Sequence, residues 1–204
     1  MVVALVVAAD VYAISFWYRG FRWTLALMIF APVVGLFIMK RVGHLSFAAM
    51  GLRLLPRQAY ARWLRVFWIT GAAAIWGAAI IYGLLIAIDK PPDESAHALS
   101  WHAFWTFHLP VVVVHAPVCE ELIFRVLLCT ALRAWVGDRV NVAISGVAFA
   151  AMHFHAGNAA PNNVLAGFLF AWLFLKSGSW IVPLAFHVLG NLVVGLLGLL
   201  VAYA

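Results

Sequence analysis

Charged residues are scarce in this chain of 204 residues, of which only 10% are Asp, Glu, Lys or Arg. The sequence also lacks Ser- and Pro-rich linkers, low-complexity tracts, internal repeats and polar stretches of the size of a soluble domain. In contrast, 67% of the residues are hydrophobic and the mean hydropathy is +1.04. A soluble core of this length cannot hide so much apolar surface. Composition therefore predicts a single transmembrane bundle over residues 1–204.

Cysteine is nearly absent as well, because the chain has only Cys119 and Cys129. Ten residues apart on one helix, the two would be separated by ~15 Å along its axis, which excludes a disulfide between them. Neither belongs to a CxxC pair, so a structural zinc site is not indicated. The net charge of +6 is no evidence for a nucleic-acid partner, because basic residues of a membrane protein report its orientation.

Apolar runs divide the chain into about seven candidate spans, since ~20 apolar residues cover the hydrocarbon core as a helix. The expected fold class is therefore all-α, a polytopic transmembrane helical bundle. In the fourth span, Pro110 and Pro117 predict a kink or an unwound start just before Glu120. The spans are predicted at Val2–Tyr18, Trp23–Met39, Phe67–Ile88, His108–Leu132, Val140–Phe154, Val164–Leu175 and Trp180–Val201.

Basic residues concentrate between the second and third predicted spans. The stretch from Lys40 to Arg65 carries six Lys or Arg residues and no acid, interleaved with Leu and Trp. This pattern is typical of a cytoplasmic loop with an amphipathic interfacial helix. With the N-terminus inside, nine Lys and Arg residues lie on the cytoplasmic side and three outside. The positive-inside rule therefore favours a cytoplasmic N-terminus. The expected location is the cytoplasmic membrane of a bacterium.

Two carboxylates and an arginine lie inside the apolar fourth span. Glu121 and Arg125 are four residues apart and share a helix face, so they can form an ion pair. Glu120 points about 100° away on an α-helix, which leaves its carboxylate for another task. Ionisable residues at this depth are costly and usually face a bundle interior or a wet cavity. The three side chains therefore indicate either a buried active site or an ion-pair cluster that joins helices.

Two further motifs follow on later spans. Phe149 and His153 are four residues apart on the fifth span, and His187 and Asn191 are four apart on the seventh. A carboxylate, two imidazoles and an amide supply a base, a group that orients water and two oxyanion donors, which are the parts that amide hydrolysis needs. His153 lies near the outer end of the fifth predicted span, whereas His187 lies closer to the inner end of the seventh. A common site therefore requires a packing of the spans that brings the two histidines together.

The motifs EExxxR, FxxxH and HxxxN, in this order on successive late spans, resemble the CAAX protease and bacteriocin-processing (CPBP/Abi) family of intramembrane glutamic endopeptidases, related to the type II CAAX prenyl endopeptidase. The resemblance extends over Leu109–Leu197, and residues 105–197 form the expected catalytic core. It implies a protease of membrane-associated proteins or peptides, of a C-terminal processing or sorting-signal type, which works without a cofactor. The expected partners are membrane lipid and such a substrate.

The resemblance also implies a role for each motif residue. Glu120 is expected to act as general base on a water held by His153, and to return the proton to the leaving amine. His187 and Asn191 are expected to donate hydrogen bonds to the developing oxyanion. Glu121, Arg125 and Phe149 are expected to support these groups.

Three alternatives remain from the residues alone. Glu120, His153 and His187 could bind zinc as two histidines and a carboxylate. Membrane-embedded Glu and His also form proton relays in carriers, although the chain shows no internal repeat. A non-catalytic immunity protein could use the same groups only to join helices. Replacement of Glu120 by Gln separates a protease from the scaffold alternative, because it is expected to abolish cleavage and to leave a scaffold function largely intact.

Overall fold

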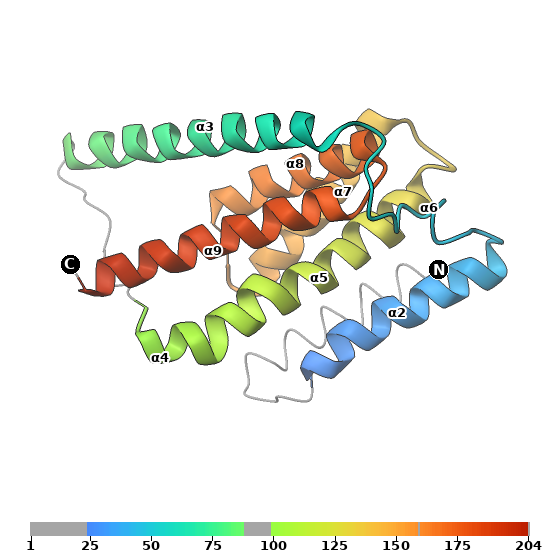
Figure 1. Ribbon diagram of the computed structural model, residues 1–204, viewed down its shortest axis with the longest axis horizontal. Helices are drawn as coiled ribbons and strands as arrows, with labels where there is room; N and C mark the ends of the chain where they lie inside the picture. Colours follow the sequence, from blue (N-terminus) through green and yellow to red (C-terminus); the bar gives the residue numbers. More distant parts are fainter. Residues whose placement is uncertain (1–23, 88–98, 159, 204) are drawn as a thin grey trace.

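A computed structural model of the chain describes residues 24–87, 99–158 and 160–203, which form helices and no strand. This confirms the predicted all-α class for these residues (Figure 1). The first predicted span, Val2–Tyr18, lies outside them, and the number of spans stays a prediction. The helices are α2 (Thr24–Val42), α3 (Tyr60–Ala87), α4 (Trp101–Ala103), η2 (Phe104–His115), α5 (Ala116–Glu120), η3 (Glu121–Cys129), α6 (Thr130–Leu132), α7 (Asp138–His155), α8 (Pro161–Ser177) and α9 (Ile181–Tyr203).

Among the described residues, one helix is long and apolar enough to cross a membrane by length and composition. It covers Ile181–Leu200 within α9 and has a mean hydropathy of 2.0. Twenty residues at a rise of about 1.5 Å each match the thickness of a bilayer core. The structure thus supports one of the predicted spans on this criterion, and the arrangement of seven remains an expectation.

The helix that carries the two glutamates is continuous from Trp101 to Leu132, through α4, η2, α5, η3 and α6. It starts where the Ser100 hydroxyl accepts a hydrogen bond from the Ala103 N–H. The expected unwound turn before Glu120 is absent, since Ala116–Glu120 is α-helical. Two wide π-helical segments flank this turn instead, and Pro110 lies inside the first. Proline lacks an N–H donor, so a wider turn accommodates it without breaking the helix.

The predicted basic interfacial helix between the second and third spans does not form. Residues 43–59 are turns and irregular backbone between α2 and α3. Gly51 has φ +82°, a conformation that interrupts a helix and that glycine adopts without strain. The segment bonds instead to the end of α8 and the turn behind it. Its hydrogen bonds are Arg57 N–H to Ser177 O (2.8 Å), Trp180 N–H to Gly51 O (3.0 Å), Gln58 Nε2 to Lys176 O (3.0 Å) and Ser179 Oγ to Arg53 O.

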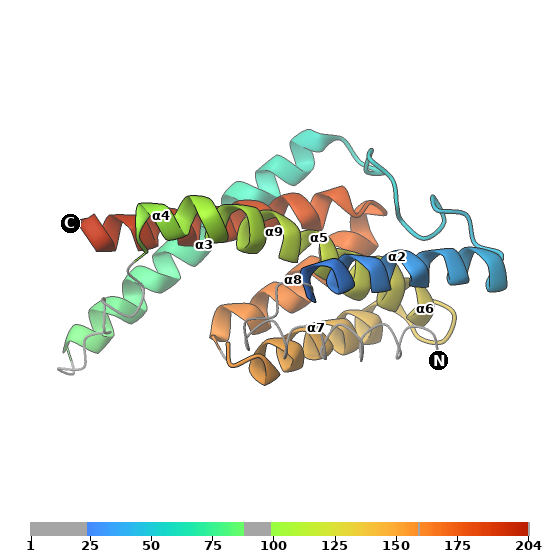
Figure 2. The same cartoon turned by 90° about the horizontal axis from the view of Figure 1, so that it is seen from below.

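The core of the molecule surrounds η3, in which every residue from Glu121 to Leu127 is buried. The antiparallel helices α7 and α8 cover one side of it (Figures 1 and 2). Two glycines allow them to approach closely, because a Cβ atom added to Gly167 would lie 2.8 Å from the carbonyl oxygen of Gly146. This packing brings Phe149 of α7 onto Phe124 of η3, with ring centres 5.5 Å apart.

Helix α3 is held at its N-terminal end and extends along one edge of the bundle (Figures 1 and 2). Trp63 is buried there, with its ring edge-on to Trp172, and Phe67 packs edge-on against Phe186. The following turns expose large apolar side chains, as a helix facing lipid does. The exposed residues are Trp68, Ile69, Ile75, Trp76, Ile80 and Leu84.

Candidate active site

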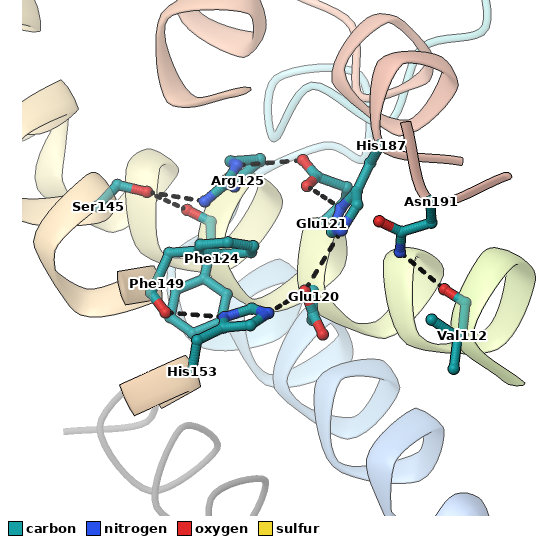
Figure 3. A network of polar contacts seen from close by, with 10 residues as sticks. All are labelled: Val112, Glu120, Glu121, Phe124, Arg125, Ser145, Phe149, His153, His187 and Asn191. Carbon is teal, nitrogen blue, oxygen red and sulfur yellow. Dashed lines mark hydrogen bonds and ion pairs between the residues drawn. The ribbon is translucent and has the colours of Figure 1, made fainter. Parts of the chain in front are cut away.

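Three helices bring the ionisable residues of the three motifs together. Glu120 ends α5, His153 lies in the last turn of α7, and His187 lies in the second turn of α9. The carboxylate atom Oε2 of Glu120 is 3.6 Å from Nε2 of His187 and 3.9 Å from Nε2 of His153. The two histidines therefore converge on one oxygen atom, as the sequence-based site required (Figure 3).

His187 connects the two glutamates. Its Nδ1 lies 3.0 Å from Oε1 of Glu121, and its Nε2 faces Glu120. Because Glu121 is ion-paired with Arg125, its carboxylate is charged and can only accept hydrogen bonds. His187 Nδ1 must therefore carry the proton of this contact. Glu121 thus fixes which nitrogen of His187 is turned toward Glu120.

The orientation of His153 follows from its own helix. Its Nδ1 lies 3.0 Å from the carbonyl oxygen of Phe149, four residues earlier. A carbonyl oxygen only accepts, so Nδ1 donates and Nε2 is left to face Glu120. The ring also packs on the Phe149 ring, with centres 4.4 Å apart. Both imidazoles therefore present the same atom, Nε2, to the same carboxylate oxygen.

Arg125 contacts the cluster through Glu121 and is fully buried. Its Nε is 3.1 Å from Oε2 of Glu121, and its Nη1 donates to the Ser145 hydroxyl at 3.3 Å. The guanidinium carbon lies 4.8 Å from the centre of the Phe149 ring, with Phe124 and Phe170 slightly farther away. A desolvated guanidinium over an aromatic face gains about 2 kcal/mol or more. The expected pairing of Glu121 with Arg125 is present, with Phe149 packed between Arg125 and His153.

Burial increases from Glu120 toward Arg125. The side chains of His153 and Glu120 are 14% and 8% exposed to solvent, whereas those of Glu121 and Arg125 are fully buried. Two carboxylates and one guanidinium leave one unit of negative charge when the imidazoles are neutral. A proton added to His187 or to Glu120 makes the cluster neutral, which lowers the cost of burying it. The charge balance of the cluster thus favours one added proton, on His187 or on Glu120.

Asn191 is oriented differently from the expected oxyanion donor. It lies one turn after His187 on α9, but its side-chain nitrogen donates to the carbonyl oxygen of Val112 in η2, at 2.8 Å. Its own backbone oxygen lies 3.3 Å from Nε2 of His108. In this structure, the amide group joins α9 to η2. Its role in catalysis stays a prediction.

The sequence analysis did not identify Asn141 and Ser145, which are fully buried polar residues of α7. They lie eight and four residues before Phe149, so a four-residue spacing connects them with Phe149 and His153 on one face of the helix. The signal in the sequence is NxxxSxxxFxxxH. It is not specific, because Asn and Ser side chains often bond only to neighbouring backbone groups.

No group of three or more His, Cys, Asp or Glu side chains in the described part of the chain has an arrangement suited to a metal ion. The zinc alternative for Glu120, His153 and His187 remains open to experiment. The cluster as it stands offers a carboxylate oxygen and two ring nitrogens at one point, backed by a buried ion pair. This arrangement can accept a proton from water and pass it on.

The comparison with protein families gives one match. Residues 100–193 match the family model of type II CAAX prenyl endopeptidase Rce1-like proteins. No curated protein and no solved structure matches the chain. The matched residues begin at the cap of α4 and end two residues after Asn191, so they include all three motifs. The family consists of membrane-embedded proteases, and residues 100–193, just under half of this chain, are similar to it.

Proposed function

We propose that this protein is an intramembrane endopeptidase that hydrolyses a peptide bond of a membrane-associated protein or peptide with a water activated by Glu120. The observation that supports this proposal most is the convergence of Nε2 of His153 and Nε2 of His187 on Oε2 of Glu120. A base needs to lie within reach of the proton it takes and of groups that hold the water. The family match adds the reaction class.

In the proposed reaction, Glu120 takes a proton from a water that His153 orients. The hydroxide attacks the scissile carbonyl, and the carbonyl oxygen becomes an oxyanion. His187 enters this step already protonated, the state in which the cluster is neutral. As an imidazolium it stabilises the oxyanion, with Nδ1–H on Glu121 and Nε2–H on the oxyanion, and Asn191 adds a second donor. Each such donor contributes about 2.7–4 kcal/mol to the transition state. Glu120 then returns its proton to the leaving amine as the C–N bond breaks.

The substrate class we propose is a membrane-associated protein that carries a C-terminal processing or sorting signal. The test uses a co-expressed, tagged single-span reporter with such a tail, and compares wild type with Glu120→Gln and His187→Ala. We expect both variants to lose cleavage and wild type to resist a strong zinc chelator. Loss of wild-type cleavage with chelator would instead support the zinc protease. Cleavage that persists in Glu120→Gln would overturn the proposal, and a reporter that wild type leaves uncut would favour a carrier or immunity protein.

We propose the cytoplasmic membrane of a bacterium as the location, with the N-terminus and Lys40–Arg65 inside. The exposed residues Trp135 and Asn158 lie at opposite ends of α7 and serve as probes. Single cysteines at these positions are treated with a membrane-impermeant maleimide in intact cells. We expect labelling at 158 and none at 135, and the reverse pattern would invert the topology. The native Cys119 and Cys129 are buried, so they contribute little background.

A further inference from the structure

One face of α7 carries a ladder of four residues that all point toward the central helix. Asn141, Ser145, Phe149 and His153 follow each other at four-residue intervals. Asn141 Nδ2 donates to the carbonyl oxygen of Cys129 at 2.8 Å, and Ser145 Oγ donates to that of Phe124 at 3.1 Å. Both carbonyls belong to the π-helical segment η3, whose wide turns weaken the regular backbone bonding. The ladder thus fixes η3 against α7.

Ser145 also bonds to the side chain of Arg125. Its hydroxyl oxygen accepts from Nη1 of Arg125 at 3.3 Å while its proton goes to Phe124 O, so a hydroxyl satisfies both contacts at once. Nε and Nη2 of Arg125 have no hydrogen-bond partner among the residues that the structure describes, so the 3.1 Å contact of Nε with Glu121 is an ion pair without hydrogen-bond geometry. The hydrogen bond from Nη1 to Ser145 is therefore the directional contact that sets the plane of the guanidinium (Figure 3).

These contacts form a continuous chain that ends at Glu120. Ser145 contacts Arg125 at 3.3 Å, and Arg125 contacts Glu121 at 3.1 Å. Glu121 then accepts from His187, whose other ring nitrogen lies 3.6 Å from Glu120. We propose that Ser145 is a positioning residue for the proposed hydrolysis, which holds Arg125, and through it Glu121 and His187, in register with Glu120. This inference rests on the proposed function, and it adds a residue outside the three motifs.

Loss of the hydroxyl releases one end of the guanidinium without removing any charge from the site. Arg125 can then turn about its remaining contact with Glu121, and the carboxylate and His187 follow. A displacement of about 1 Å in a catalytic group costs up to about 100-fold in rate. We expect Ser145→Ala to lower kcat by about 10- to 100-fold and to leave KM within about three-fold of wild type, because no contact with substrate is removed.

The experiment measures kcat and KM of the full-length protein in detergent micelles, with the tail of the reporter as an internally quenched peptide. The matched control is Ser177→Ala, since Ser177 is equally buried and its hydroxyl bonds to Ser179 in the turn after α8, away from the site. We expect this control to keep the kcat of wild type. Ser145→Thr retains the hydroxyl and should recover most of the activity. If Ser145→Ala does not reach the membrane, Ser145→Cys replaces it, with a weaker hydrogen bond and an intermediate kcat.

A double-mutant cycle separates positioning through Arg125 from a general packing role. Arg125→Lys keeps the charge but loses the second nitrogen that reaches Ser145. In that background, we expect Ser145→Ala to change kcat by less than about three-fold. An equal loss in both backgrounds, or wild-type kcat in Ser145→Ala, would overturn the inference. If Ser145→Ala overturns this inference but Glu120→Gln is inactive in the same assay, the proposed function still stands. An active Glu120→Gln would contradict both the proposed function and the role of Ser145.

Discussion

Nδ1 of His187 lies 3.0 Å from Oε1 of Glu121, so the last helix is hydrogen-bonded to the central helix inside the site. Glu121 therefore binds His187 in addition to forming its ion pair with Arg125. One carboxylate therefore orients an imidazole with one oxygen and neutralises a buried guanidinium with the other. In the proposed mechanism, stability and catalysis depend on the same side chain.

Replacement of Glu121 by Gln should destabilise the protein strongly. The substitution leaves the buried Arg125 without a counter-charge, and loss of one partner of a buried ion pair costs about 3–5 kcal/mol. Unfolding by denaturant in detergent micelles measures this change. The matched control is Asp138→Asn, because the Asp138–Lys176 pair is half exposed and such pairs contribute about 0–1 kcal/mol. Similar losses in the two variants would contradict the structural role of the buried pair.

Two glycine substitutions should have opposite effects on stability, because only one of the two glycines lies at the close approach of α7 and α8. A Cβ at Gly167 would lie 2.8 Å from the backbone of Gly146, so Gly167→Ala should cost about 1–3 kcal/mol through overpacking. At Gly71 of α3, an added Cβ meets nothing within 4 Å, and Gly71→Ala should stabilise by up to about 1 kcal/mol. Thermal unfolding of both variants tests this pair. A stable Gly167→Ala variant would mean that the helices are farther apart.

Several elements of the fold could be predicted from local sequence alone. The bounds of α7, α8 and α9 lie within three residues of the predicted ones, because long apolar runs with polar turns between them report helices directly. The basic segment 43–59 could not be predicted in this way. Its conformation depends on hydrogen bonds to Ser177, Ser179 and Trp180, which lie over a hundred residues later.

The anchoring of this basic segment can be tested at Gly51. The residue has φ +82°, and an added Cβ would lie 2.5 Å from the Phe174 ring, so Gly51→Ala is both strained and crowded. We expect the segment to detach and trypsin to cut faster at Arg53 and Arg57. Gly157 has φ +81° with open space around it, and Gly157→Ala serves as the control for backbone strain. Equal trypsin sensitivity in both variants would exclude a specific role for the Phe174 contact.

The sequence predicts which residues belong to the candidate site better than it predicts how they are arranged in space. Motifs with four-residue spacing identified Glu120, His153 and His187, because helical periodicity puts such pairs on one face. Their convergence depends on the tertiary packing of three helices. The same packing decides that Asn191 donates to Val112 and that Ser145 reaches Arg125, and no spacing rule contains this information.

Asn191 should affect both structure and rate. Asn191→Ala removes the bond to Val112 and the proposed oxyanion donor, so we expect a loss of about 1–3 kcal/mol in stability. We also expect kcat to fall about 100- to 1,000-fold for the folded protein. Kinetics per folded molecule, with the folded fraction from size-exclusion chromatography, separate the two effects. A lower unfolding temperature with unchanged kcat would assign Asn191 to the helix contact alone.

The most direct test of the central claim is the turnover of purified Glu120→Gln against the quenched reporter peptide, in the presence of a zinc chelator. General-base catalysis contributes about 100- to 10,000-fold to a rate. We expect kcat to fall by that factor while wild type keeps its activity in the chelator and both proteins unfold at similar temperatures. A Glu120→Gln variant that turns over at the wild-type rate would contradict the assignment of Glu120 as the base.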